Sequence, residues 1–248
     1  MFNKDISYDL SLEENISKII LENINKLSLK IDKNSHRFLS HLSHGNRKIY
    51  GFNYLLGRFA AQKIKQELLE QDIIRVERSL EKEVKVQAKY SIDKPFLPKE
   101  LKRYQVQDKI YFTTNFHRFF YYFSLHKDKE NFWDRFNKSF HHYCCFAYEK
   151  LAIELVNLMF DINSAQSFWM KNYEVDIFYQ DSERFLIGEV KNNKKVCLST
   201  LGELKEKSLK FMRKPDIYII FSSNGYSKEM LKNKDALLLS LDNFKEFL

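Results

Sequence analysis

Apolar residues recur at helical spacing in the first part of the chain, and polar residues interrupt them where helices are expected to begin and end. Ser11 and Glu14 have the three-residue spacing of a capping box at a helix start. Gly45 follows a second periodic stretch, at the place where a left-handed residue commonly ends a helix. The helices predicted here cover residues 12–29, 35–44 and 52–70.

Two β-type stretches follow these helices, at residues 72–79 and 106–112, and we expect them to pair. The segment between them, residues 80–107, holds two of the three prolines and mixed charges, which indicates a wing loop or an interdomain connection. Helices followed by a two-stranded wing are typical of a winged helix, whose basic side chains touch a phosphate backbone. A plain helical packing domain explains residues 1–112 equally well. The candidate backbone contacts are Arg47, Lys48, Arg58, Lys63 and Lys65.

Helical and β-type patterns alternate in the remainder of the chain, residues 113–248, which predicts an α/β fold with a mixed sheet flanked by helices. The aromatic run at residues 116–124 is dense enough to favour core packing over a base-stacking platform. A continuous apolar run at residues 216–221 indicates a buried strand. Further helices are predicted over residues 132–158, 198–211 and 227–232, and further strands over residues 173–179, 185–191 and 236–241.

The polar residues 180–184 separate two of the predicted strands and indicate a β-hairpin. With the turn in the middle of this segment, Asp176 lies opposite Glu189. Glu174 then lies opposite Lys191. Because strand side chains alternate between faces, these four charged residues are expected on one face of the hairpin. The other face is predicted to carry Val175, Ile177, Leu186 and Val190.

Like charges directly opposite each other on neighbouring strands destabilise a sheet, and a cation between them would remove the repulsion. Asp176, Glu189 and the main-chain carbonyl of Val190 form an all-oxygen ligand set that suits Mg²⁺ or Mn²⁺. Lys191 is expected to project beside this set, where its ammonium group would orient a water molecule or hold a phosphate group. A solvated hairpin face is the alternative interpretation of the same residues.

The stretch that contains Asp176, Glu189 and Lys191 resembles the D…(D/E)xK core of the PD-(D/E)XK, or restriction-endonuclease-like, nucleases. Val175 stands in place of the motif's proline. Residues 110–241 more closely resemble the C-terminal domain of unknown function of a group of archaeal and bacterial AAA-type ATPases. The segments that carry this second resemblance are IYFTTNFHRFFYYF, CFAYEKLAIEL, EVDIF and GEVK.

The resemblance implies a restriction-endonuclease-like mixed sheet and a metal-dependent cleavage of phosphodiester bonds at Asp176, Glu189 and Lys191. It also implies an auxiliary glutamate from the first helix of the domain, here Glu149, for which a solvent-exposed position is the alternative. The sequence has no G-x-x-x-x-G-K-S/T phosphate loop. We therefore expect any ATPase partner to be a separate subunit.

A net charge of +8 and a pI near 9.1 favour a polyanionic partner, with DNA as the expected one. Nine basic residues against three acidic ones fall between residues 184 and 214, at or after the candidate site. Charge runs of this kind commonly form solvated faces, but one that adjoins a phosphate-cleaving motif is a candidate for contact with the nucleic-acid backbone. The expected contacts are Lys194, Lys195, Lys205, Lys207 and Lys210.

No stretch of the sequence has the length and hydropathy of a membrane span or the pattern of a secretion signal, so we expect a cytoplasmic protein. Cys144, Cys145 and Cys197 lack the spacing of a metal site and are expected to be buried free thiols.

The sequence thus predicts a metal-dependent nuclease that favours DNA. The alternative is a catalytically silent module with the same fold that binds DNA or a separate ATPase. A toxin-like component that depends on a partner is a third possibility.

Overall fold

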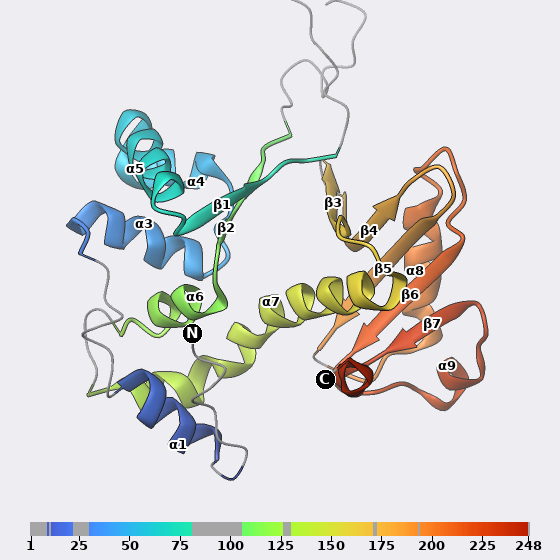
Figure 1. Ribbon diagram of the computed structural model, residues 1–248. Helices are drawn as coiled ribbons and strands as arrows, with labels where there is room; N and C mark the ends of the chain where they lie inside the picture. The colour runs from blue at the N-terminus through green and yellow to red at the C-terminus, as the bar shows by residue number, and fades with distance from the viewer. Residues whose placement is uncertain are drawn as a thin grey trace, which may run out of the picture. The chain divides into compact units, whose positions relative to one another are not determined.

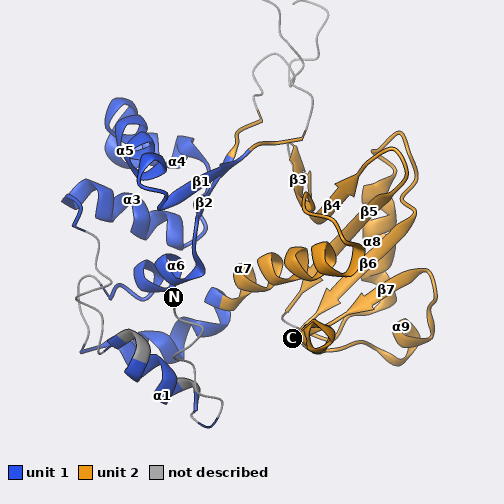
Figure 2. Cartoon of the chain, in the orientation of Figure 1, with its two compact units in different colours: residues 1–77, 109–143 blue, residues 78–108, 144–248 orange. Residues whose placement is uncertain are grey.

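The chain forms two compact units (Figure 2). Unit 1 comprises Met1–Glu77 and Lys109–Tyr143, and unit 2 comprises Arg78–Asp108 and Cys144–Leu248. These units do not coincide with the predicted regions, because the residues that follow position 112 pack with the N-terminal helices. The computed structural model describes residues 9, 11–21, 30–80, 106–125, 130–170, 173–192 and 194–247 (Figure 1).

Unit 1 is mainly helical. The first predicted helix is present in its described part, where Ser11 and Glu14 form both hydrogen bonds of the capping box. Residues 22–29 of that prediction lie outside the described residues. The helices are α1 (Leu12–Ile16), the π-helical turn η1 (Ser17–Leu21), α3 (Lys33–Ser43), α4 (Ile49–Leu56), α5 (Arg58–Glu70), α6 (Asn115–Tyr122) and the first part of α7 (Phe132–Phe160).

The single helix predicted over residues 52–70 is wrong, because Gly57 separates α4 from α5. Its φ of 83° lies in the region that glycine adopts without strain, and the chain turns there between the two helices. The apolar pattern does not continue in phase across this turn. Phe59, which extends the pattern of α4 in the sequence, is 91% exposed, whereas Ile64 and Leu68 of α5 are buried.

Two short strands, β1 (Ile74–Glu77) and β2 (Lys109–Phe112), pair in antiparallel fashion as predicted. Lys48, which precedes α4, forms an additional bridge to Lys109 of β2. Most of the predicted wing loop, residues 81–105, lies outside the described residues. In the described residues, unit 1 therefore combines its helices with a small antiparallel ladder.

Aromatic side chains of α6 form a core in unit 1 together with the start of α7. Phe119, Phe120, Tyr121 and Phe123 are all buried. Phe119 meets Tyr143 edge-on with ring centroids 5.6 Å apart, and such pairs add about 0.5–1.5 kcal/mol beyond the area that they bury. The aromatic run is therefore part of the core, as predicted, because its rings pack against other aromatic rings of unit 1.

Unit 2 is built on a sheet of five strands, β3 (Gln166–Met170), β4 (Tyr173–Gln180), β5 (Phe185–Lys191), β6 (Ile217–Ser222) and β7 (Ala236–Leu239), which neighbour one another in this order. The β3–β4 and β4–β5 pairs are antiparallel, and the β5–β6 and β6–β7 pairs are parallel. The mixed sheet confirms the predicted α/β class. The sequence pattern does not predict β3, which contains no β-branched residue.

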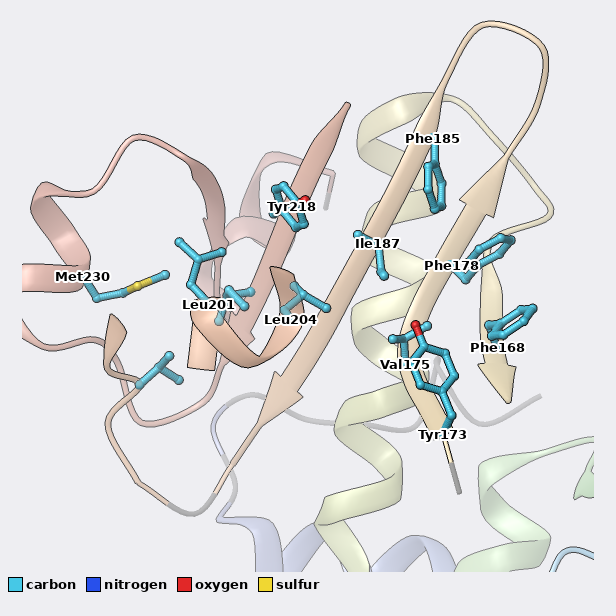
Figure 3. Packing of buried hydrophobic residues seen from close by; sticks show 12 residues of the cluster. Phe168, Tyr173, Val175, Phe178, Phe185, Ile187, Leu201, Leu204, Tyr218 and Met230 are labelled. Atoms are coloured by element: carbon cyan, nitrogen blue, oxygen red, sulfur yellow. The ribbon is translucent and has the colours of Figure 1, made fainter. Parts of the chain in front are cut away.

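Helices cover both faces of this sheet. On one face, α8 (Leu198–Ser208) contributes Leu201 and Leu204 to a cluster of buried residues, which Figure 3 shows. On the other face, the second part of α7 contributes Leu155 and Val156 to a separate cluster. The remaining elements of unit 2 are α9 (Lys228–Lys232) and the 3-10 helix η3 (Leu241–Glu246).

None of the three cysteines forms a disulfide, as predicted, but they are not all buried. Cys144 and Cys145 are half-buried on α7, and Cys197 is exposed directly before α8. Within the described part of the chain, no helix combines the length and the apolar character that crossing a membrane requires.

Gly188 lies in β5, where the sheet is packed on both faces. A Cβ atom added there would lie 3.0 Å from the Ile177 side chain and 3.0 Å from the Ile219 carbonyl oxygen. The carbonyl belongs to the neighbouring strand and cannot move aside without distorting the sheet. Gly188→Ala is therefore expected to lower the free energy of unfolding by about 1–3 kcal/mol, measured by urea denaturation.

Gly202→Ala on α8 is the matched control, because nothing lies within 4 Å of a Cβ atom at that position. Alanine is favoured over glycine in a helix by up to about 1 kcal/mol, so this variant is expected to hold or gain stability. An equal loss of stability in both variants would contradict the packing argument.

Candidate metal centre

The turn between β4 and β5 is held by its own polar side chains. The Asp181 carboxylate accepts hydrogen bonds from the N–H groups of Glu183 and Arg184 at 2.8 and 2.6 Å. Arg213 donates to the carbonyl oxygens of Asp181 and Glu183 from outside the hairpin. These contacts fix the length of the turn, and thereby the register of the two strands.

The β4–β5 ladder has the predicted register and runs as far as the pair Ile177↔Gly188. Continued by one residue, this register sets Asp176 beside Glu189 on the adjacent strand. The effect of the Glu189 charge on the pKa of Asp176 agrees with this extension of the register, because it requires the two carboxyl groups to lie near each other.

A β-bulge interrupts the alternation of β4 side chains next to Asp176. The pairing of β4 with β3 shifts by one residue, so that β4 has an extra residue between Val175 and Phe178. Val175 consequently joins Phe178 in the cluster under α8, whereas Ile177 joins the cluster under α7. The prediction that Val175 and Ile177 share a face is wrong, because period-two alternation does not hold through a bulge.

Asp176 lies at this bulge and is partly buried. Its carboxylate accepts the Val190 N–H at 2.8 Å, so Val190 reaches the site through its amide, and its carbonyl remains a predicted ligand. Burial and the charges of Glu189 and Glu149 raise the pKa of Asp176 to about 7. A carboxyl group that titrates near neutral pH marks a place that is short of positive charge.

Glu189 lies under α8, on the strand face of Phe185 and Ile187, and is 9% exposed. Its Oε1 accepts a hydrogen bond from Lys191 Nζ at 2.8 Å, and its Oε2 accepts one from Lys207 Nζ at 2.6 Å. Although burial acts in the opposite direction, the Glu189 carboxylate raises the pKa of Lys191. Because helices cover the sheet on both sides, the strand face that carries Glu189 is not an open polar surface.

Glu149 belongs to α7, the helix that covers the other face of the sheet, and its charge contributes to the raised pKa of Asp176. It does not complete a ligand set. In the described part of the chain, no three side chains of His, Cys, Asp or Glu form a group that could hold a metal ion. Glu149 thus acts on Asp176 through its charge, and its role as an auxiliary ligand stays a prediction.

The chemistry of the donors at this centre fits a divalent cation. Asp176 and Glu189 offer carboxylate oxygens, the ligands that Mg²⁺ prefers, and Mg²⁺ needs only one or two protein carboxylates because it keeps several waters. The electrostatics agree, because a cation would relieve the repulsion that raises the pKa of Asp176. Asp176 and Glu189 are therefore the residues that would hold the ion.

The lysines predicted to contact nucleic acid differ in their exposure and in the partners that they have within the chain. Lys194 and Lys195 follow β5 and are exposed. Lys205 pairs with Asp235 at 2.6 Å, and Lys210 lies 4.4 Å from the centroid of a tyrosine ring. Only part of the basic run is thus an open surface.

Lys207 belongs to the candidate centre, because its ammonium group bonds to Glu189. The charge pattern of the sequence predicts Lys207 on the basic face together with its neighbours. One signal was present in the sequence: Lys207 follows Leu204 by three residues, which places it beside the buried stripe of α8. That spacing separates it from the more exposed Lys210.

One protein family matches part of the chain. It is DUF234, archaeal and bacterial proteins of unknown function, and the match covers residues 120–210. This finding agrees with the resemblance to the C-terminal domain of unknown function of archaeal and bacterial ATPases. The matched segment includes Glu149, Asp176, Glu189 and Lys191. No curated protein and no solved structure matches the chain.

Asp176→Asn is expected to change how the stability of the metal-free protein depends on pH. A carboxyl group whose pKa is raised to about 7 in the folded state stabilises the fold below its unfolded pKa of about 4, and this contribution is lost as the pH rises to about 7. The wild type should therefore lose on the order of a few kcal/mol across this range. The asparagine variant, which carries no charge, should lose less and be the more stable protein above neutral pH.

Urea unfolding with a chelator present, repeated across this pH range, measures the difference. Asp161→Asn, at an exposed position just after α7, is the control and should follow the wild type. If Asp176→Asn retains the pH dependence of the wild type, the buried like-charge pair does not exist in solution.

Proposed function

We propose that this chain is a metal-dependent nuclease that hydrolyses phosphodiester bonds of nucleic acid, with DNA as the favoured substrate. The observation that carries the proposal is that Asp176 of β4 and Glu189 of β5 lie near enough for their charges to interact, with the Lys191 ammonium group 2.8 Å from Glu189. Two carboxylates and an ammonium group at one point supply both a cation site and a phosphate-binding group.

Asp176 and Glu189 would hold Mg²⁺ or Mn²⁺. The ion, when bound, would polarise the phosphodiester and lower the pKa of a bound water molecule. Lys191 holds a phosphate oxygen or orients the attacking water, and a raised pKa keeps its ammonium group charged for this task. Glu149 adds negative charge near Asp176 and so increases the attraction of the site for a cation.

The order of elements in unit 2 supports a restriction-endonuclease-like fold. One helix, three strands, a second helix and a fourth strand follow one another as α7, β3, β4, β5, α8 and β6. This is the core order that the resemblance to PD-(D/E)XK nucleases implies. Asp176 comes from the second of these strands, and Glu189 and Lys191 come from the third.

A winged helix in unit 1 would supply a contact with DNA. The helices α3, α4 and α5 precede the paired strands β1 and β2, and the Lys48↔Lys109 bridge adds a third extended segment. Arg58 and Lys63 of α5 are exposed and are candidates for phosphate contacts. Arg47 is a weaker candidate, because it donates to a tyrosine hydroxyl of its own unit at 2.9 Å.

A second candidate function is a nuclease-fold module that binds DNA or a separate ATPase without cleaving. The observation in its favour is that both carboxylate oxygens of Glu189 already accept hydrogen bonds from lysines. A centre whose carboxylate is neutralised internally can be a structural ion pair. Activity distinguishes the two functions.

The deciding experiment incubates the purified full chain with Mg²⁺ or Mn²⁺ and with single- and double-stranded DNA and RNA. Chelator-sensitive cleavage supports the nuclease. If every form of nucleic acid stays intact but is retarded in gels, the binding module is correct.

Lys191→Arg is expected to keep the fold and the binding of metal but to lose cleavage by at least about a hundredfold. Both side chains are positive, but the planar guanidinium is bulkier and aims its donors differently, so only a role that depends on the position of the ammonium group is lost. Initial rates on a labelled oligonucleotide measure the loss, and thermal unfolding reports on the fold. Glu174→Gln on the adjacent strand is the control and should cleave nearly as the wild type does. If Lys191→Arg cleaves normally and Glu174→Gln does not, Glu174 belongs to the site and Lys191 does not.

A further inference from the structure

Glu189 is bonded to two lysines that come from different elements. Lys191 follows it on β5 and reaches Oε1, whereas Lys207 reaches Oε2 from α8. The side chains of Glu189 and Lys207 are 12% and 30% exposed, so their pair is far better shielded from water than an ordinary surface pair. A carboxylate held in this way must give up part of its bonding before it can bind a metal ion.

The turn of α8 that carries Lys207 is anchored independently of this ion pair. The Tyr173 hydroxyl, at the start of β4, donates to the Lys207 carbonyl at 2.6 Å. Ser208, the next residue, is buried and shares a hydrogen bond of 3.0 Å with the Tyr218 hydroxyl. The backbone of Lys207 is therefore fixed against the sheet, and only its side chain is free to exchange partners.

We propose that Lys207 is a second functional lysine of this centre, which competes with the divalent cation for Glu189 and binds substrate phosphate together with Lys191. The inference rests on the proposed function and adds to it a residue that the D…ExK motif does not contain. The ligand class is a phosphodiester. An ammonium group that leaves a carboxylate can donate the same kind of charge-assisted hydrogen bond to a phosphate oxygen.

Competition follows from the electrostatics of a single carboxylate. An ammonium group and a divalent cation at Glu189 repel each other, and each neutralises the same negative charge. Without the Lys207 ammonium group, the Glu189 carboxylate keeps only its hydrogen bond to Lys191 and is still shielded from water. It therefore attracts the cation more strongly. The coupling is reciprocal, so the cation weakens the hold of Glu189 on Lys207 by the same factor.

The first test measures Mn²⁺ binding to the full chain by calorimetry, without nucleic acid. Lys207→Met is expected to bind Mn²⁺ about tenfold more tightly than the wild type. Lys205→Met is the matched control: it removes the same charge from the same helix, but its partner is Asp235, so the affinity for Mn²⁺ should stay near the wild-type value. Unchanged or weaker Mn²⁺ binding in Lys207→Met would overturn the inference.

Two further variants keep the test valid if Lys207→Met folds poorly. Lys207→Arg retains a positive charge at Glu189 and is expected to bind Mn²⁺ like the wild type. Tyr173→Phe keeps the aromatic ring but removes the hydrogen bond to the Lys207 carbonyl, so it should shift Mn²⁺ affinity in the same direction as Lys207→Met, by a smaller factor. A shift in the opposite direction would count against the proposal.

The second test measures binding of a duplex oligonucleotide in Ca²⁺, which takes the same oxygen ligands as Mg²⁺. Lys207→Met is expected to bind the duplex more weakly than Lys205→Met does, although it binds the cation more tightly. A lysine with a purely structural role cannot move the two affinities in opposite directions. Equal duplex affinities in the two variants would remove Lys207 from the phosphate site.

Failure of this inference is distinguishable from failure of the proposed function. If the wild type binds no Mn²⁺ and Asp176→Asn behaves like the wild type, the metal centre itself is refuted. If the wild type binds Mn²⁺ through Asp176 but Lys207→Met matches Lys205→Met in both tests, the centre stands and Lys207 is not part of it.

Discussion

Two carboxylates on neighbouring strands, in a sheet that helices cover on both faces, are the constraint on which the centre of unit 2 depends. Like charges brought together away from water raise the free energy of the fold unless donors or cations compensate them. The Val190 N–H compensates Asp176, and the ammonium groups of Lys191 and Lys207 compensate Glu189. Asp176 still has a pKa of about 7, so the compensation is incomplete on its side of the pair. The proposed cation would remove that deficit of positive charge.

The topology of the sheet determines which element supplies the compensation. β5 and β6 are parallel, so the chain between them has to return across the sheet, and α8 makes this return over the face that carries Glu189. Leu201 and Leu204 bury one stripe of α8, and Lys207 lies at the border of that stripe. The helix that closes the core therefore also delivers the second ammonium group. An isolated hairpin with one solvated face would have no such source of charge.

The hairpin register could be predicted from the sequence because it depends on residues that are close together in the chain. A polar turn and two alternating strands are enough to align Asp176 with Glu189. The bulge could not be predicted, because it arises from pairing with β3, a strand without β-branched residues. The pair between Lys207 and Glu189 depends on the way α8 crosses β5, which no local pattern contains. Local interactions thus specified the scaffold of the centre, and long-range packing specified its charge balance.

Net charge alone does not tell which lysines can bind a polyanion, because the lysines differ in the partners that they have within the chain. A lysine releases counterions from DNA only after it leaves its own carboxylate. Lys205 and Asp235 form a largely exposed pair, which contributes little to stability and exchanges readily for a phosphate. Lys207 leaves a buried carboxylate, which costs more unless another cation replaces it. The free energy needed to reach a phosphate therefore rises with the burial of the acidic partner. In the proposed mechanism, Lys207 is accordingly the lysine of the basic run whose release depends most on a bound cation.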